Sequence, residues 1–292
     1  MTRGLPVLFL GVDGGGSGCR VALARADGTV LARAERGPAN VTSDFDGALA
    51  NLRAAIHEAL SAAGLDESAL AACRAHAGLA GVVTRSDADR VRAALPPARW
   101  TVTDDRPTAL AGALGGQDGA LICVGTGSFL ISRRGAALRT IGGWGFQLSD
   151  QGSGAWLGRA LLEETLLAHD GLAAFTDLTR AVLIDFGGAP DRIVAFAGQA
   201  GPQDYARLAR KLTEAAAAGD DTGRAIMARG ASYLTRALAA LDLAGNAPLC
   251  LSGGLGPSYA PYLSPPLAAR LRAPAGTALD GALLLAGQDG AP

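Results

Sequence analysis

The fold of this chain is decided by the stretch Gly11-Val12-Asp13-Gly14-Gly15-Gly16-Ser17, which leaves one apolar run and enters another. A related stretch, Val124-Gly125-Thr126-Gly127-Ser128, follows much later in the chain. Because glycine lacks a Cβ, its backbone N–H can approach an anion closely, and glycine also tolerates positive φ. Ser17, Thr126 and Ser128 add hydroxyl donors. One such turn is a weak signal, but the duplication predicts two loops that hold a polyphosphate.

The composition limits the classes of partner. The chain has 292 residues, of which 49% are hydrophobic, and its 26 basic and 27 acidic residues give a formal net charge of −1. This balance provides no electrostatic footprint for nucleic acid or for an anionic membrane. We therefore expect a small substrate, neutral or weakly charged, and a core divided between two domains.

The four cysteines lie far apart and form no Cys-x-x-Cys pair, which predicts reduced thiols and neither a zinc knuckle nor an iron–sulfur cluster. The segment from Met1 to Pro6 leads directly into a strand-like run instead of a secretion signal. No apolar stretch is long enough to cross a bilayer. These features predict a cytoplasmic protein.

Hydrophobic periodicity predicts alternating strands and helices in the first part of the chain. Asp27-Gly28 is typical of a hairpin turn, Ser43 is the expected cap of the first helix, and Gly64 is its expected stop. The predicted elements are strands at 5–13, 19–25 and 29–35, a helix from about 45 to 60, a strand at 75–79, a helix at 87–95, a strand at 100–103 and a helix at about 108–114.

The later part of the chain begins in the same order, which predicts two similar α/β domains. We expect a first domain at 1–114, a second domain with helical insertions at 115–277, and a final helix at about 278–290 that can pack back on the first. The predicted elements of the later part are strands at 120–124, 129–133 and 138–141, helices at 155–169, 204–218 and 222–243, a strand at 249–251 and a helix at 279–286.

Seven motifs in order resemble those of the sugar kinase, heat-shock protein and actin ATPase superfamily. More narrowly, nearly the full length of the chain resembles the amino-sugar kinases of the BadF/BadG/BcrA/BcrD ATPase-like group. The resemblance implies duplicated ribonuclease H-like (actin-like ATPase) domains with a nucleotide in the cleft between them, ATP and Mg²⁺ as cofactors, and an amino sugar as the small-molecule partner. Exposed apolar helix faces would permit a homodimer. The matching stretches are 11–17, 37–40, 78–81, 103–105, 125–128, 142–145 with 149–154, and 252–254.

The resemblance assigns nucleotide binding to residues of three glycine-rich turns. Asp13, at the end of a strand, is placed to hold Mg²⁺, through bound water because this ion dehydrates reluctantly. The alternative is that Asp13 caps its own turn. The expected nucleotide-binding residues are Asp13, Gly14, Gly15, Gly16, Ser17, Gly125, Thr126, Gly127, Ser128, Gly253 and Gly254.

Asp105 is the expected catalytic base, because its position agrees with that of the catalytic aspartate in the resembled kinases. Asp104 is its competitor: neighbouring residues at a strand end point in opposite directions, so one should face the cleft while the other caps the next helix. Both acids could instead be caps. Arg106-Pro107 follows, where the resembled kinases have a small residue, and an Arg106 ion pair with one acid leaves open which acid is available.

The resemblance places a sugar site at Asn40, Gly81, Asp105, Trp144, Gly145 and Asp150. Each polar residue has a structural alternative, since Asn40 follows Pro38 in a turn and Asp150 is a favoured helix cap. Trp144 and Phe146 could line the sugar or simply pack.

We therefore expect ATP-dependent phosphorylation of glucosamine or N-acetylglucosamine at the 6-hydroxyl. One alternative is an ATPase switch or activator that acts on a partner protein, and another is a catalytically silent sugar sensor. The sequence shows neither partner-binding insertions nor metal-binding cysteines, and it keeps Asp13, Asp105 and both loops. The choice between a free amine and an acetamide stays open, with the 149–154 motif closer to the glucosamine kinases.

Overall fold

A computed structural model of the chain describes residues 7–288 and divides into two compact units. The first unit contains the chain up to Asp118 together with the segment from Pro274, and the second is Gly119–Ala273. The sequence placed this boundary at 114. Within residues 7–288, no helix is both long enough and apolar enough to cross a membrane.

The first unit is built on a five-stranded mixed sheet. Its central strand, β1, runs antiparallel to β2 and parallel to β4, and is buried at most of its positions. The strand order is β3-β2-β1-β4-β5, with β1 at Leu8–Gly14, β2 at Cys19–Arg25, β3 at Val30–Arg36, β4 at Arg74–Leu79 and β5 at Arg99–Thr103. The ends of β1, β4 and β5 therefore meet at one edge of the sheet.

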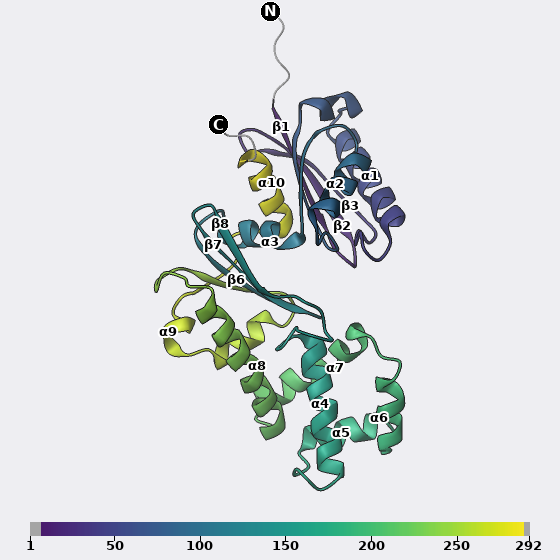
Figure 1. Cartoon of the computed structure of the whole chain (residues 1–292), viewed down its shortest axis with the longest axis vertical. Helices are drawn as coiled ribbons and strands as arrows, with labels where there is room; N and C mark the ends of the chain where they lie inside the picture. The colour runs from purple at the N-terminus through teal and green to yellow at the C-terminus, as the bar shows by residue number, and fades with distance from the viewer. Residues whose placement is uncertain (1–6, 289–292) are drawn as a thin grey trace, which may run out of the picture. The chain divides into compact units, whose positions relative to one another are not determined.

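Helices cover both faces of this sheet, with α1 and α2 on one side and α3 and α10 on the other (Figure 1). Their bounds are Phe45–Ala62 for α1, Arg85–Ala94 for α2, Asp105–Leu114 for α3 and Ala278–Gln288 for α10, with a 3₁₀ turn η1 at Glu67–Ala72. Gly11 of β1 lets the backbone of α10 come close, since a Cβ there would lie 2.8 Å from the Leu283 nitrogen.

Several predicted boundaries need correction. Asp44, not Ser43, caps α1, because its carboxylate accepts a hydrogen bond from the Gly47 N–H at 3.0 Å. The α3 helix begins at Asp105, three residues before the predicted start at Thr108, because Asp104 caps it. The predicted strand residues 5 and 6 and helix residues 289 and 290 lie outside the described residues.

The second unit repeats the sheet of the first. Its order, β10-β9-β6-β7-β8, places β6 in the position of β1, antiparallel to β7 and parallel to β9. The strands are β6 at Gly119–Val124, β7 at Ser128–Arg134, β8 at Ala137–Gly142, β9 at Leu249–Ser252 and β10 at Leu271–Arg272. The predicted α/β class with a repeated strand order is confirmed, although the short β10 was not predicted.

The helices of the second unit form one group in which α4 packs against α5, α6, α7 and α8 (Figure 1). The α5 and α6 helices were not predicted as separate elements. The bounds are α4 at Gly154–His169, α5 at Asp177–Asp185, α6 at Pro190–Ala197, α7 at Pro202–Ala218, α8 at Asp221–Ala240, η2 at Gly256–Tyr262 and α9 at Pro265–Ala268.

The contact between α3 and α10 depends on glycine. A Cβ at Gly281 would overlap the Thr108 carbonyl oxygen and the Gly112 nitrogen. We expect Gly281→Ala to lower the free energy of unfolding by about 1–3 kcal/mol, because backbone cannot move aside as a flexible side chain can. Urea denaturation would measure this, with Gly245→Ala as the control, since a Cβ at Gly245 meets nothing within 4 Å. An unchanged urea midpoint in Gly281→Ala would show that α3 and α10 can move apart without a loss of stability.

Candidate functional site

The first glycine-rich loop leaves β1 with an exposed tip. Gly16 and Ser17 are exposed, and the Gly15 N–H donates to the Gly18 carbonyl oxygen at 2.9 Å. Gly14, Gly15 and Gly16 all lie outside the left-handed region, so positive φ is not why glycine is needed here. Space is the reason at Gly14, where a Cβ would lie 2.6 Å from Leu79 Cδ2.

Backbone hydrogen bonds join this loop to two neighbouring turns. The Ala80 N–H donates to the Gly14 carbonyl oxygen at 2.7 Å, and the Ala39 N–H donates to the Gly15 carbonyl oxygen at 2.9 Å. The Val41 N–H donates to the Ala80 carbonyl oxygen at 3.1 Å. The turn after β3, the turn after β4 and the glycine-rich loop therefore form one continuous surface.

Asn40 and Gly81 meet on that surface. The Asn40 Oδ1 accepts hydrogen bonds from the backbone N–H groups of Thr42 and Ser43 at 3.0 and 3.1 Å, so Asn40 has the turn role that was its alternative. Gly81 has a φ of 90°, and a Cβ there would lie 2.5 Å from the same oxygen. Among the described residues, the Asn40 Nδ2 has no hydrogen-bond partner, which leaves two donors for a ligand.

Asp13 ends β1 beside an arginine that the sequence analysis did not select. Arg20 lies opposite Asp13 in the β1–β2 register, and its Nη1 is 3.7 Å from the Asp13 Oδ2. Burial raises the pKa of the Asp13 carboxyl, and the Arg20 charge opposes that shift. The hairpin spacing could have identified Arg20, because residues facing each other across a tight hairpin are fixed by register.

The structure distinguishes the two neighbouring aspartates. Asp104 caps α3, and its Oδ1 accepts from the Arg106 N–H at 2.9 Å and from the Arg106 Nε at 2.7 Å. Asp105 forms no ion pair with any described residue. Its pKa is raised, first by burial and then by the Asp104 charge. Asp104 is thus engaged in capping, and Asp105 is the carboxylate available to a ligand.

A buried histidine supports the start of α3. The Thr103 hydroxyl donates to the Asp104 carbonyl oxygen at 2.8 Å, and His76 Nε2 lies 3.2 Å from the same hydroxyl oxygen. Because the single hydroxyl hydrogen is already used, His76 must donate from Nε2, which fixes its tautomer. His76 is therefore a packed strand residue that also helps to hold the strand end before Asp105.

The second glycine-rich loop rests on the first turn of α4. The Gly154 N–H donates to the Gly125 carbonyl oxygen at 2.7 Å, and the Ala155 N–H donates to the Thr126 carbonyl oxygen at 3.1 Å. The Thr126 hydroxyl donates to Gln203 Oε1 of α7 at 3.2 Å. This loop is held by backbone bonds to a helix N-terminus, where partial positive charge accumulates.

The Gly253 turn lies directly beside this second loop. Gly253 has a φ of 77°, and a Cβ there would lie 3.1 Å from the Gly125 nitrogen. The Leu255 N–H donates to the Val124 carbonyl oxygen at 3.0 Å. The structure therefore brings the predicted turns at 125–128 and 252–254 together within the second unit.

Asp150 completes this cluster. It is 7% exposed, has a φ of 62°, and accepts hydrogen bonds from the backbone N–H groups of Ser128 and Gly145. Burial raises the pKa of its carboxyl, and these two hydrogen bonds oppose the shift. Ser153, not Asp150, caps α4, so the capping alternative is wrong. The Ser128 hydroxyl donates to the Gln151 carbonyl oxygen at 2.9 Å and is engaged inside the loop.

A first cavity of the second unit lies beside the loop that follows β8. It has a volume of about 440 Å³ and includes both Trp144 and Gly145. Phe146, in the same lining, packs on Tyr205 with ring centroids 5.1 Å apart. Phe146 is thus a packing residue that also faces the cavity.

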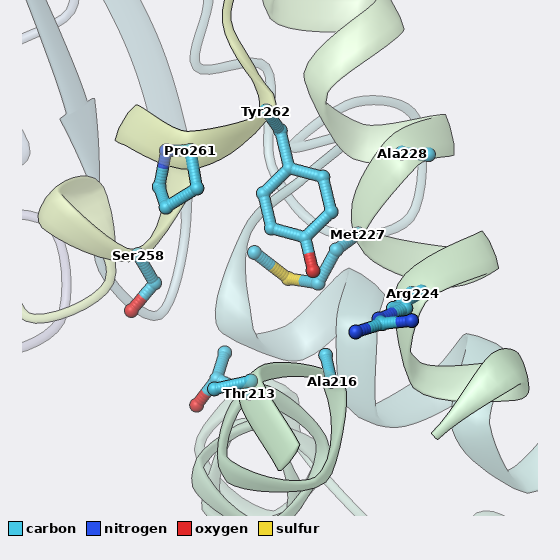
Figure 2. Close-up of a pocket in the computed structure, with 9 residues that line it drawn as sticks. Thr213, Ala216, Arg224, Met227, Ala228, Ser258, Pro261 and Tyr262 are labelled. Atoms are coloured by element: carbon cyan, nitrogen blue, oxygen red, sulfur yellow. The ribbon is translucent and has the colours of Figure 1, made fainter. Parts of the chain in front are cut away.

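A second cavity, of about 610 Å³, lies among α7, α8 and η2. Figure 2 shows the Tyr262 ring directed toward Met227 and Arg224, with the Ser258 and Thr213 hydroxyls at the opposite edge. The cavity offers apolar walls, one cation and a few hydroxyl groups. The sequence analysis missed it, because residues of α7, α8 and η2 meet only through tertiary packing.

Within residues 7–288, no three histidine, cysteine or acidic side chains gather into a metal site. Mg²⁺ keeps several waters and commonly takes one or two carboxylates together with substrate phosphates. Asp13 provides such a single carboxylate, 19% exposed beside the first loop.

Two sheets of the same strand order, each with a glycine-rich loop after its central strand, define a duplicated α/β protein of the actin-like ATPase type. Residues 10–262 match the model of the BadF/BadG/BcrA/BcrD ATPase family. The chain belongs to this family.

The chain resembles named relatives over nearly its whole length. It is 32% identical to glucosamine kinase GspK from Vibrio cholerae, covering 96% of each chain. A crystal structure from Chromobacterium violaceum called "Putative N-acetylglucosamine Kinase" shares 36% identity, with a TM-score of 0.84, covering 96% of this chain and 98% of that one. A ROK family glucokinase from Streptomyces griseus shares the fold at a TM-score of 0.53 and 20% identity, covering 96% of this chain and 99% of that one.

The partial burial of the Asp105 carboxylate has a consequence for stability. Its pKa is higher in the folded chain than in the unfolded chain, so ionisation destabilises the folded state above the ordinary carboxyl pKa. We expect Asp105→Asn to raise the free energy of unfolding at about pH 7, with the gain vanishing near pH 3, where both forms are neutral. Urea titrations at the two pH values would measure this.

Asp104→Asn is the matched control, because asparagine also caps helices but loses the Arg106 ion pair. It should give no gain in stability at either pH. A loss of stability in Asp105→Asn at neutral pH would contradict the inference that ionisation of Asp105 opposes folding.

Proposed function

We propose that this protein is an ATP-dependent kinase that phosphorylates the 6-hydroxyl of an amino sugar. The observation that carries the proposal is the difference between two neighbouring acids: Asp104 is bound to Arg106, whereas Asp105, the first residue of α3 after β5, is partly buried and has no ion pair among the described residues. A base must have a carboxylate that is available and whose pKa is raised toward the working pH. The names of the V. cholerae and C. violaceum relatives support the class of substrate.

In the proposed reaction both glycine-rich loops bind the same triphosphate. Phosphoryl transfer needs mainly positioning and charge stabilisation, which backbone N–H groups at glycine turns supply. Gly16 and Ser17 at the exposed tip of the first loop would bind phosphate, with Gly15, whose N–H is bound to the Gly18 carbonyl oxygen, shaping the loop and Gly14 needed for its packing. Gly125 to Gly127 and the adjoining Gly253 and Gly254 would do so in the second unit.

Asp105 accepts the proton of the sugar 6-hydroxyl as that oxygen bonds to the γ-phosphorus. The bond from the phosphorus to the bridging oxygen breaks, and ADP leaves with its electron pair. Burial raises the pKa of Asp105, so the carboxylate holds the proton more strongly than an exposed one would. The His76–Thr103 hydrogen bond steadies the strand end before Asp105.

Asp13 would hold Mg²⁺ through water, and the bound ion would neutralise charge on the phosphates. Arg20, whose Nη1 lies 3.7 Å from the Asp13 Oδ2, helps to hold the Asp13 carboxylate in place and offers a further cation next to the phosphate loop. The raised pKa of Asp13 is consistent with a carboxylate whose counter-charge is completed by a ligand.

The cavity of Figure 2 would hold the base of ATP. Its volume, about 610 Å³, is in the range of ligand pockets. Tyr262 and Met227 provide apolar surfaces for a planar ring, and Arg224 provides a cation that can stack on one. The η2 turn that carries Tyr262 follows directly after Gly253 and Gly254, so the base and phosphate sites are continuous along the chain.

The sugar would lie against Asn40, Gly81, Asp105, Trp144, Gly145 and Asp150. The two donors of Asn40 Nδ2 and the acceptor oxygens of Asp150 suit hydroxyl groups, and a site with such groups rejects analogues that leave them unpaired. Both glucosamine and N-acetylglucosamine fit this polar set.

A panel of hexoses at fixed ATP and Mg²⁺, followed by coupled release of ADP, tests the proposal. We expect turnover with glucosamine or N-acetylglucosamine, and phosphate at the 6-position by nuclear magnetic resonance of the product. Sugar-independent ATP hydrolysis with no phosphorylated sugar would favour an ATPase switch and would reject the kinase.

Asp105→Asn should lower kcat by about 10²–10⁴-fold with little change in sugar affinity, because it removes proton transfer. Asp104→Asn should keep turnover, since asparagine can also cap α3. The base must be ionised, so kcat/KM falls as pH falls through the raised pKa of Asp105. Removing the Asp104 charge, which raises that pKa, should move this acidic limb to lower pH. A turnover loss confined to Asp104→Asn would reverse the two roles.

Filling the Figure 2 cavity should weaken nucleotide binding. Ala228 lines the cavity and is exposed on α8, so Ala228→Trp can be accommodated without disturbing the core. We expect the KM for ATP to rise by about tenfold or more while the KM for the sugar changes little. Ala225→Trp, on the same helix and also exposed but outside the lining, is the control. Equal KM values for ATP in both variants would place the base elsewhere.

A further inference from the structure

The cavity next to Gly145 is larger than the reacting sugar needs. It lies between the loop after β8 and the junction of α6 and α7, and its volume is about 440 Å³. A methyl group fills roughly the space of one water, about 30 Å³, so an acetyl group would leave most of this cavity empty. Its lining includes Trp144, Gln147, Leu148, Ala200, Pro202 and Tyr205.

Two large apolar side chains of this loop are exposed to solvent. Trp144 is 75% exposed and Leu148 is 84% exposed, although both line the cavity. An exposed apolar pair is unfavourable in water, and such pairs side by side commonly mark a binding surface. The two residues therefore form one wall that a ligand could cover.

The loop that presents this wall is well supported. The Leu148 and Ser149 N–H groups both donate to the Gly145 carbonyl oxygen, at 3.2 and 2.8 Å. At its base, Tyr205 packs against Phe146 and Phe196 with ring centroids 5.1 and 5.5 Å apart. A supported wall loses little conformational freedom when a ligand binds.

The cavity continues from the proposed sugar site. Gly145 lines the cavity, and its N–H donates to the Asp150 carboxylate. A sugar held by Asp150 therefore has the cavity as its immediate neighbour on the Gly145 side. A substituent on that sugar would reach Trp144 and Leu148.

The chemistry of the lining selects the kind of substituent. None of its residues carries a charged side chain, which disfavours an anionic or cationic group. Its polar groups are the Gln147 amide, the Tyr205 hydroxyl and the backbone of two glycines. An open aromatic face together with a few polar groups suits a ligand that is apolar on its flat face and polar at its edge. A pyranose ring has this character, whereas an alkyl chain would leave the polar groups unpaired.

We propose that this cavity is a second carbohydrate subsite, which binds a neutral pyranose ring linked to the amino sugar in the active site. The protein would then accept disaccharides of amino sugars, and the added ring would stack on Trp144 with Leu148 at its edge. The inference rests on the proposed function, because it takes Asp150 as a contact of the reacting sugar.

Isothermal titration calorimetry without ATP tests the subsite separately from catalysis. The probes are N-acetylglucosamine, its neutral β-1,4-linked disaccharide, and glucosamine carrying an N-hexanoyl chain. We expect the disaccharide to bind about tenfold more tightly than the monosaccharide. Equal affinities would overturn the proposal, and a gain for the hexanoyl probe alone would replace the sugar ring with an acyl chain.

Leu148→Ala is the main variant, because Leu148 is exposed and lies outside the proposed monosaccharide contacts. It should reduce the disaccharide preference severalfold and leave monosaccharide affinity unchanged. Trp144→Ala should reduce the preference further, and it should also weaken the monosaccharide, because Trp144 is a proposed contact of the reacting sugar as well. Leu172→Ala, at a residue that is 76% exposed and outside the cavity, is the matched control and should keep the full preference.

The two proposals fail in different ways. A disaccharide preference without phosphorylation of any sugar would reject the kinase and keep the subsite. Phosphorylation of the monosaccharide with no disaccharide preference in binding would keep the kinase and reject the subsite.

Discussion

The close approach of backbone to backbone at the strand ends is the constraint on which the site depends. In the first unit, the carbonyl oxygens of Gly14 and Gly15 are bound by N–H groups of two other turns, so three loops are fixed as one surface. In the second unit, Gly253 lies against Val124 and Gly125 in the same manner. A side chain at Gly14 or Gly253 would push the neighbouring groups apart, because a Cβ would lie 2.6 Å from Leu79 Cδ2 in the first case and would overlap the Val124 carbonyl oxygen in the second. The sheet order places the strand ends together, and the missing Cβ atoms let the turns join.

Three partly or fully buried carboxylates, Asp13 and Asp105 in the first unit and Asp150 in the second, each have a pKa raised by burial. Raised carboxyl pKa values mean that ionisation opposes folding at neutral pH. Acids selected only for stability would be exposed, paired or capping, as Asp104 is. Acids whose pKa values are raised by burial are typical of sites where a ligand, metal ion or proton completes the charge balance. The contrast between Asp104 and Asp105, two adjacent residues of one type, shows this difference most directly.

Local sequence patterns predicted most elements because their causes are local. Alternating apolar residues and the Asp27-Gly28 turn predicted the β2–β3 hairpin, and both glycine-rich turns fall at the ends of central strands. The cap of α1 was misassigned because Asn40 and Asp44 share the turn, and side-chain choice there depends on packing. The cavity of Figure 2 was missed altogether, and of the cavity beside Gly145 only the loop after β8 was anticipated, because the walls of both come from helices and loops far apart in the chain. Periodicity shows which face of a helix is apolar, but it does not show which faces leave space between them.

The two units share a strand order but divide the chemistry unequally. The first carries more of the charged groups, with Asp13 and Arg20 paired across β1 and β2 and Asp105 at the start of α3, after β5, whereas the second carries Asp150. The second offers a loop bound to a helix N-terminus and two cavities whose linings hold a single charged residue, Arg224. Binding of charged groups and binding of apolar groups need different surroundings. Charged groups need polar neighbours, whereas planar or apolar groups need apolar walls that exclude water. A duplicated fold resolves this conflict, since each copy can be specialised for one demand. The common strand order keeps a glycine-rich loop after the central strand of each sheet.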